Sequence, residues 1–314
     1  MSALFERIAV VGLGLLGGSV GLAAKSHGAA RSVSGSTRQS EAKQQALQSG
    51  AVDEVLPLAE VARGAQLVIV ATPVHAMPGV LEQLLPSLET GAIVTDVGSV
   101  KGVVFETLPG LLPPGVHFVG SHPMAGSHER GMSFARADLF EGAACVVSGS
   151  GDSDALERVA AFWRALGSRV VLREPARHDD EVAWTSHLPH LLAFAFAHAL
   201  SGAPESAAEV SGSGFRDFTR LAQSDPELWA DILTANRKAL AAPFGAASES
   251  LAALARAIEA GDAEALEALL SSARANLFHA SSHAHRGSAP SDQNNASSTE
   301  SGATQTGELS TTHE

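Results

Sequence analysis

Cysteine is nearly absent from this sequence of 314 residues, in which Cys145 is the only one. A single thiol cannot form an internal disulfide or build a cysteine-based metal cage, and low cysteine content is typical of reducing compartments. Cys145 stands in an apolar, strand-like segment, which indicates an inert core residue. We therefore expect a cytoplasmic protein without a cysteine-based metal site.

Positive charge is also scarce. The chain has 21 Lys and Arg residues against 34 Asp and Glu residues, which gives a formal net charge of −13. Proteins that bind nucleic acid need a basic surface, so nucleic acid is not an expected partner. The composition favours a small-molecule substrate, and an anionic substrate would require a local cationic pocket.

Long apolar runs are missing as well. No run of about 18 apolar residues occurs, and no charged leader precedes an apolar stretch, so we expect neither a membrane span nor a targeting signal. The length suits two domains, each large enough to bury its own core. Hydrophobic residues make up 45% of the chain, which supports a globular protein.

Short β-rich segments alternate with helical patterns through the first half of the chain. Continuous apolar strands separated by helices are typical of a parallel sheet that helices cover on both faces. We predict a Rossmann-like, doubly wound α/β domain with a mainly parallel sheet over residues 1–174. The predicted strands are 7–11, 32–36, 67–71, 93–96, 117–120, 144–148 and 169–172, and the predicted helices include 40–49, 78–85 and 154–166.

Helical patterns replace the β-rich segments after Glu174 and Pro175. We predict an all-α domain over residues 175–280. The expected breaks between its helices are 201–204, 211–214 and 242–243.

Helix signals within this second domain are clear at several points. Asp225–Pro226 is a typical helix start, with Asp as the N-cap and Pro in the first turn. Ala- and Leu-rich helices are expected over residues 248–260 and 262–276. Residues 281–314 are polar with almost nothing apolar, so we expect a disordered tail.

A glycine-rich turn follows the first predicted strand and opens a helix. In such a turn, one Gly permits the tight bend, one lets a pyrophosphate approach the backbone, and one lets helix and strand pack closely. The helix N-terminus then faces the phosphates. We predict a dinucleotide cofactor, NAD(P)+, bound by Gly12, Leu13, Gly14, Leu15, Leu16 and Gly17.

The end of the second predicted strand bears on the choice of cofactor. An acidic residue that binds the ribose 2′-hydroxyl of NAD+ belongs there, about 20 residues after the glycine-rich turn. This chain has Ser36, Thr37 and Arg38 instead. An Arg pairs well with a 2′-phosphate, so NADP+ is favoured. The alternative is that Arg38 is a solvated loop charge and that Glu41 binds the ribose of NAD+.

Three loops stand at the carboxyl ends of predicted strands, where open α/β sheets bind their ligands. The first contains Thr72 and Pro73, which we expect to contact the cofactor. The second contains Ser99, and the third contains His122 within a Gly-rich loop.

His122 is the candidate general base. Oxidation of an alcohol removes a hydride from carbon and a proton from oxygen, and a His with a pKa near neutrality accepts that proton. Ser99 is expected to hold the imidazole or the alcohol. The alternative is a loop imidazole satisfied by backbone groups. A metal site built from His122 and His128 would lack carboxylate or thiolate ligands nearby, so no metal is predicted.

Ser186, His187 and His190 interrupt an otherwise apolar helical segment, residues 185–198. Their spacing of three and four residues places them close together, and a buried imidazole requires a partner or a function. Pro189 lies inside the predicted helix, where it favours a kink that directs the histidines toward a cleft. We expect a substrate site. The alternative is a pair of hydrogen-bonded core histidines.

Five segments, in order along residues 5–280, together resemble the prephenate/arogenate (cyclohexadienyl) dehydrogenase family of tyrosine biosynthesis. The resemblance implies an NAD(P)+-dependent oxidative decarboxylation of prephenate to 4-hydroxyphenylpyruvate and CO2, or of arogenate to tyrosine. The segments are 12–19, 96–101, 121–126, 186–190 and 214–220.

The resemblance also implies roles for single residues. His122 is the base at the substrate 4-hydroxyl, and Ser99 is its hydrogen-bonding partner. Arg220 binds a substrate carboxylate. The substrate pocket is lined by Ser186, His187 and His190.

Arg216 and Arg220 lie four residues apart. Because prephenate is a dianion and the chain is acidic, a focused cationic patch is needed, and these two residues supply it. The alternative is a solvated helix face with Asp217 as partner. Trp229 matches a family position near the pocket, although core packing explains it equally well.

Two other functions stay open. A β-hydroxyacid-type dehydrogenase also pairs a dinucleotide domain with a helical domain, but is expected to use a helical Lys for catalysis. A non-catalytic dinucleotide sensor would use its helical domain only for dimerisation. Helical second domains of the resembled family form homodimers, so we expect a homodimer through the helices of residues 248–276.

Overall fold

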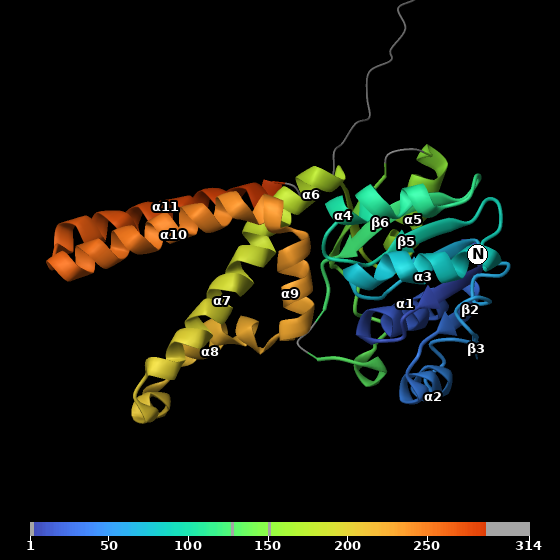
Figure 1. The fold of residues 1–314 in the computed structure, drawn as a ribbon, viewed down its shortest axis with the longest axis horizontal. Helices are drawn as coiled ribbons and strands as arrows, with labels where there is room; N and C mark the ends of the chain where they lie inside the picture. Colours follow the sequence, from blue (N-terminus) through green and yellow to red (C-terminus); the bar gives the residue numbers. More distant parts are fainter. Residues whose placement is uncertain (1–2, 127–128, 150–151, 287–314) are drawn as a thin grey trace, which may run out of the picture. The chain divides into compact units, whose positions relative to one another are not determined.

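A computed structural model describes residues 3–126, 129–149 and 152–286 of the chain (Figure 1). Two compact units are present, residues 1–248 and residues 249–314. The first unit contains the whole sheet and the helices up to the beginning of α10. The second unit contains the rest of α10 and α11.

The first unit is built on one eight-stranded sheet with the order β3-β2-β1-β4-β5-β6-β7-β8. All neighbouring strands are parallel except β6 and β7, which are antiparallel. The predicted mainly parallel sheet is thus confirmed, and only the two-residue edge strand β3 was missed. The strands are β1 (Phe5–Val11), β2 (Ala30–Ser36), β3 (Glu54–Val55), β4 (Leu67–Val70), β5 (Ile93–Asp96), β6 (His117–Pro123), β7 (Ala144–Ser148) and β8 (Arg169–Leu172).

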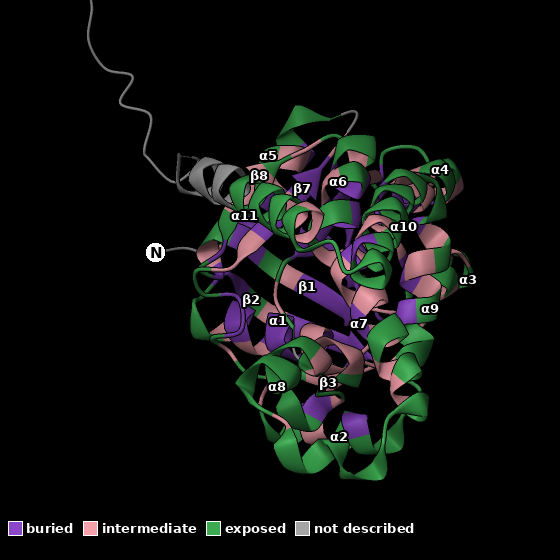
Figure 2. Cartoon of the chain, turned by 90° about the vertical axis from the view of Figure 1, so that its left-hand side faces the viewer, coloured by how far each residue is buried: buried purple, intermediate pink, exposed green. Residues whose placement is uncertain are grey.

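Helices cover both faces of the sheet because successive strand residues point to opposite sides. In β1, Ile8 and Val10 belong to one buried apolar cluster with residues of α1 and α5, whereas Ala9 and Val11 belong to a second cluster with residues of α3. Figure 2 shows β1 as a buried strand. The helices of this part are α1 (Leu15–Ser26), α2 (Ser40–Gln48), α3 (Met77–Leu84), α4 (Gly102–Thr107) and α5 (Ser153–Ala165).

After β8, every regular element among the described residues is a helix, as predicted. Asp225 caps α9 by accepting hydrogen bonds from the backbone N–H groups of Glu227 and Leu228. The helices are α6 (Pro175–Val182), α7 (Leu188–Ala199), α8 (Ser213–Thr219), α9 (Pro226–Ala235), α10 (Arg237–Ala260) and α11 (Ala263–Arg286).

Two helix boundaries differ from the prediction. The expected break at 242–243 is wrong, because α10 passes through Pro243 without interruption. The strong helix propensity of the surrounding Ala and Leu residues outweighs one lost backbone hydrogen bond. The last helix, α11, continues to Arg286, beyond the expected start of the tail at residue 281. Residues 287–314 of the predicted tail lie outside the described residues.

None of the helices in the described ranges combines the length and the apolar character needed to cross a membrane.

Candidate active site

The glycine-rich turn between β1 and α1 has the shape of a phosphate-binding loop. Gly12 has φ +95°, and a Cβ there would lie 2.4 Å from the carbonyl oxygen of Ala71. A Cβ on Gly17 would lie 1.9 Å from the carbonyl oxygen of Gly12, so both positions require glycine. Gly14 faces open space and starts α1 without a side-chain cap. The unpaired N–H groups of this helix end fit a pyrophosphate.

The leucines between these glycines differ in burial. Leu13 is buried in the apolar cluster under α1, whereas Leu15 and Leu16 are half-buried and pack against that cluster. The backbone of residues 12–17 can approach a phosphate closely because the glycines carry no side chains.

The loop after β4 lies beside this turn because β4 neighbours β1 in the sheet. Thr72 presents its methyl carbon 3.3 Å from the Cβ position of Gly12, and Pro73 follows it. The buried hydroxyl of Thr72 has no hydrogen-bond partner among the described residues. A buried, unpartnered hydroxyl next to the glycine turn fits a polar group of a bound cofactor.

At the end of β2, the three predicted residues differ in exposure. Ser36 is buried, Thr37 is half-buried, and Arg38 is exposed. Arg38 forms no ion pair with any described residue, so its guanidinium is available to an anion. Glu41, the alternative ribose ligand, is exposed in the first turn of α2, where it accepts a hydrogen bond from the side-chain amide of Gln45 at 3.2 Å.

His122 lies in a strand, not in the loop that was predicted. The strand β6 continues to Pro123 because its second half pairs with the antiparallel strand β7, in which Val146 stands opposite His122. The partner strand is distant in the sequence, so the local Gly-rich pattern did not reveal this extension. The result is a base candidate held rigidly near the carboxyl end of β6, with only 7% of its surface exposed.

The hydrogen-bond partner of His122 is His178 of α6. The Nδ1 atom of His122 lies 2.8 Å from Nε2 of His178, and Nδ1 of His178 lies 2.8 Å from Oδ1 of Asp179. Ser99 is half-buried and makes no hydrogen bond to His122, so the partnership implied by the resemblance is not present in this structure. The sequence analysis did not identify His178 and Asp179. A neighbouring His and Asp at the start of the helical domain could have indicated a hydrogen-bonded pair near the site.

The loop after β5 is fixed by a buried ion pair between Lys101 and Asp96. Asp96 also accepts hydrogen bonds from the backbone N–H groups of Gly98 at 2.8 Å and Ser121 at 3.1 Å. Because Ser121 precedes His122 in β6, these bonds connect the two strand ends. The pair thereby holds the loop of Ser99 next to the strand of His122.

Burial lowers the pKa of His122 well below its ordinary value of 6.5, and the nearby His178, Lys101 and His187 lower it further. Each of these effects disfavours the charged imidazolium. His122 is therefore neutral at neutral pH, which is the state that a proton acceptor needs.

The segment before α7 is a π-helical turn, Ala183–His187, and Pro189 lies in the first turn of α7. The prediction of one continuous α-helix with a kink at Pro189 is thus wrong, because a π-helical turn comes before α7. The wider π turn lets the chain continue past a Pro that has no N–H to donate. It also positions Ser186 and His187, and π turns occur often at functional sites.

His187 is almost completely buried and its hydrogen bonding is half satisfied. Its Nδ1 atom accepts a hydrogen bond from Nδ2 of Asn236 at 2.9 Å, and this amide group also donates to the carbonyl oxygen of Asp179 at 2.9 Å. The Nε2 atom of His187 has no partner among the described residues. Burial, the largest effect, lowers the pKa of His187 to about 4, so the ring is a neutral donor through Nε2–H.

His190 stacks on Trp229 of α9, with ring centroids 3.7 Å apart. Its Nδ1–H donates to the carbonyl oxygen of Ser186 at 2.9 Å, while Ser186 itself is half-buried. The ring of His187 also contacts Trp229, at 6.1 Å between centroids. Trp229 therefore joins the two histidines, which explains its place near the predicted pocket.

The two arginines differ in their relation to this cluster. Arg220 is exposed but close enough to His190 that its charge contributes to lowering the pKa of that imidazole, after the larger effect of burial. Arg216 is exposed and makes no ion pair with Asp217 or with any other described residue. Arg220 thus interacts electrostatically with His190, whereas Arg216 makes no ion pair or hydrogen bond through its side chain among the described residues.

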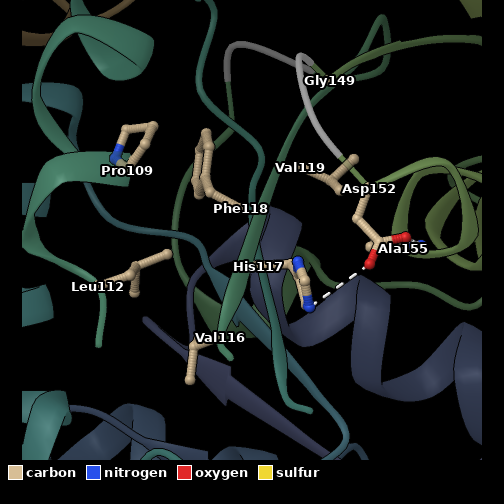
Figure 3. A pocket seen from close by; sticks show the side chains of 9 residues that line it. All are labelled: Pro109, Leu112, Val116, His117, Phe118, Val119, Gly149, Asp152 and Ala155. Carbon is tan, nitrogen blue, oxygen red and sulfur yellow. Dashed lines mark hydrogen bonds and ion pairs between the residues drawn. The ribbon is translucent and has the colours of Figure 1, made fainter. Parts of the chain in front are cut away.

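A separate pocket lies at the opposite end of β6 (Figure 3). It contains an ion pair between His117 and Asp152, with 3.5 Å between Nε2 and Oδ2. Because His117 begins β6, this pocket is remote from the carboxyl ends of the strands and does not belong to the site. Its lining residues are Pro109, Leu112, Val116, His117, Phe118, Val119, Gly149, Asp152 and Ala155.

The described residues contain no group of three or more His, Cys, Asp or Glu side chains arranged for a metal ion. His128, considered above as a metal ligand, lies outside the described residues.

Comparison with known proteins gives a consistent result. Residues 20–172 match the family model of the prephenate dehydrogenase nucleotide-binding domain, and residues 174–272 match that of the prephenate dehydrogenase dimerization domain. The chain is 34% identical to a cyclohexadienyl dehydrogenase of Zymomonas mobilis over 75% of this chain and 83% of that protein. It is 33% identical to a prephenate dehydrogenase of Bacillus subtilis over 85% of this chain and 74% of that protein.

A solved structure agrees with these relatives. Prephenate dehydrogenase of Aquifex aeolicus, in complex with hydroxyphenyl propionate and NAD+, superposes with a TM-score of 0.80 and 29% identity, covering 87% of this chain and 98% of that one. Family models covering both halves of the chain, together with relatives above 30% identity, establish the assignment. The chain belongs to the prephenate dehydrogenase family of NAD(P)-dependent oxidoreductases.

Proposed function

We propose that this protein oxidatively decarboxylates prephenate with NADP+ as the favoured cofactor and His122 as the base. NAD(P)+, when bound, accepts the hydride from ring C4. The proton of the 4-hydroxyl passes to the protein, and the bond to the ring carboxylate breaks to release CO2 and aromatise the ring. The phenolate oxygen formed in this step takes a proton back to give 4-hydroxyphenylpyruvate. The observation that supports this most strongly is a buried, neutral His122 near the carboxyl end of β6, next to a second, partly unsatisfied imidazole.

His122 takes the proton through Nε2, because its Nδ1 is engaged with His178. His187, a neutral N–H donor whose Nε2 has no partner among the described residues, binds an oxygen of the substrate. Arg220 binds a substrate carboxylate, with Arg216 adding positive potential. Ser99 stands in the loop beside His122 and contacts the substrate 4-hydroxyl. The wall of the pocket is completed by Ser186 and His190.

The cofactor preference rests on the end of β2. Ser36, Thr37 and Arg38 provide hydroxyls and a free guanidinium, and no carboxylate occupies the place where NAD-binding proteins have one. An Arg without an ion-pair partner suits a 2′-phosphate. The Aquifex aeolicus relative was crystallised with NAD+, so NAD+ bound through Glu41 is the alternative.

The two predicted domains have different roles in this proposal. Residues 1–174 bind the dinucleotide, and residues 175–280 bind substrate and dimerise through the helices of residues 248–276. The match of residues 174–272 to a dimerization domain supports this proposal. Sedimentation of the full chain is expected to show a homodimer, and a monomer at micromolar concentration would contradict it.

Steady-state kinetics with prephenate and arogenate, each against NADP+ and NAD+, tests the proposal. We expect the highest kcat/KM for prephenate with NADP+. Preference for arogenate would overturn the substrate assignment alone, and preference for NAD+ would overturn the cofactor assignment alone. No reduction in any combination would contradict the function itself.

The role of Arg38 has its own test. We expect Arg38→Ala to raise the KM for NADP+ by about tenfold or more, since a charge-assisted hydrogen bond is worth about 1.5–3 kcal/mol. The KM for NAD+ should stay unchanged and serves as the internal control. An equal effect on both cofactors would show that Arg38 does not recognise the 2′-phosphate.

A further inference from the structure

We propose that His178 and Asp179 act as positioning residues that leave Nε2 of His122 as the free proton acceptor. The inference rests on His122 being the base, as proposed above, and explains how the fold prepares it for that role. Both residues come from α6, on the helical side of the chain, whereas His122 comes from the sheet.

Asp179 is the fixed end of this chain of hydrogen bonds. Its Oδ1 accepts the backbone N–H of Lys101 at 2.8 Å, and its Oδ2 accepts the backbone N–H of Gly102 at 2.7 Å. Two backbone donors at the beginning of α4 hold both carboxylate oxygens, so the group cannot rotate away. Its third neighbour, Nδ1 of His178, must therefore donate its proton to Oδ1.

The proton positions on both rings follow from this. A neutral imidazole has one N–H and one acceptor nitrogen, so His178 with Nδ1–H presents Nε2 as an acceptor. That Nε2 lies 2.8 Å from Nδ1 of His122, which consequently carries the N–H. The proton-free nitrogen of His122 is then Nε2. The two rings meet edge to face with centroids 5.1 Å apart, which restrains rotation of both.

The same arrangement assists the proton transfer. When Nε2 of His122 takes the proton of the 4-hydroxyl, the ring becomes an imidazolium that still donates through Nδ1 to His178. Burial, His178, Lys101 and His187 oppose this positive charge. The Asp179 carboxylate, two hydrogen bonds away, has the opposite charge and favours it. The logic is that of a catalytic triad, in which a carboxylate sets the tautomer of the base.

The test combines kinetics with NMR of the full-length protein carrying ¹⁵N-labelled histidine. In the unsubstituted protein, we expect His122 to show a protonated Nδ1 and an unprotonated Nε2, with its signals assigned by their loss in His122→Asn. His178→Phe keeps a ring of similar shape but removes the acceptor. We expect it to lower kcat for prephenate by at least about tenfold without changing KM or cofactor affinity.

Two further variants separate positioning from packing. His178→Gln places an amide oxygen near the former Nε2 position and is expected to restore most of kcat. His117→Phe is the matched control, because His117 lies on the same strand as His122 and pairs with Asp152 at its far end. It should leave kcat unchanged.

An Nε2–H tautomer of His122 in the unsubstituted protein would overturn the inference, as would full kcat in His178→Phe. If His178→Phe does not fold, two measurements still test the positioning role of His178. They are the tautomer of His122 in the unsubstituted protein and the kcat of His178→Gln. Activity retained by His122→Asn would instead refute the base assignment. Loss of activity in His122→Asn with full activity in His178→Phe would refute only the positioning role.

Discussion

At the residue scale, His187 is buried, and one of its two ring nitrogens, Nε2, has no hydrogen-bond partner among the described residues. Asn236 uses its Nδ1, and burial keeps the ring neutral, so Nε2–H is left without a protein acceptor in the described part of the chain. A buried, unsatisfied donor costs about 1–3 kcal/mol unless a ligand or water satisfies it. In the proposed function, a substrate oxygen at this position would recover that energy on binding.

The first prediction concerns His187 itself. His187→Phe is expected to raise the KM for prephenate by about tenfold, because it removes the donor and keeps a ring, whereas His187→Gln retains an N–H at a similar place and should have a smaller effect. His27→Phe, just after α1, is the control and should leave KM unchanged, since the contacts of His27 are the carbonyl oxygen of Ala23 and the carboxylate of Glu141, neither of which belongs to the proposed pocket. Equal KM values for all variants would show that His187 does not touch the substrate.

The two arginines make a second prediction at this scale. Arg220→Ala should raise the KM for prephenate by about ten- to a hundredfold through loss of a charge-assisted hydrogen bond, with little change in kcat. Arg216→Ala should act more weakly, since Arg220, and not Arg216, is the arginine whose charge affects the pKa of His190. Steady-state kinetics of both variants measures this, and an unchanged KM in Arg220→Ala would contradict its role.

At the element scale, α9 presents Trp229 to the histidines and ends at Asn236, which binds His187. Asp225 begins this helix as its N-cap and also forms an ion pair with Arg130. Asp225 therefore stabilises the helix that holds Trp229 and Asn236 against the histidines.

Replacement of the cap gives a third prediction. Asp225→Ala is expected to lower the free energy of unfolding by about 1 kcal/mol and to raise the KM for prephenate, because α9 loses two N-terminal hydrogen bonds. Asp152→Ala is the matched control, since Asp152 caps α5 in the same way and faces a His. It should destabilise without changing KM. If both variants changed KM equally, the N-terminal cap of α9 would have no specific role in substrate binding.

Local signals explain how much of these elements could be predicted. All strands except β3, the glycine turn and the start of α9 follow from residues adjacent in the sequence, and they were predicted from it. The extension of β6 through His122 was not, because it depends on β7. The partnership of His122 with His178 joins residues 56 positions apart. Pairings of that kind arise from the tertiary fold and leave no periodicity in the sequence.

At the scale of the whole molecule, imidazoles held neutral make stability depend on pH. The pKa values of His122, His187 and His190 are all lowered on folding, mainly by burial. The unfolded chain therefore binds more protons than the folded chain once the pH falls below about 6.5. The stability that these residues contribute is full above that pH and is lost progressively as the pH falls toward their lowered pKa values.

Denaturant unfolding at pH 7 and pH 5 gives the fourth prediction. For His187, with a folded pKa of about 4, the expected loss is about 2 kcal/mol between these two pH values. His187→Gln should remove that part of the pH dependence, because Gln does not titrate. The same slope in both proteins would show that His187 is not held neutral by the fold.

The central claim is that His122 removes the substrate proton, and the kcat of His122→Asn with prephenate and NADP+ tests it most directly. We predict that kcat falls by about 10² or more while the Kd for NADP+, measured on the same protein, stays unchanged. A kcat equal to that of the unsubstituted protein, with the cofactor bound equally well, would contradict the claim.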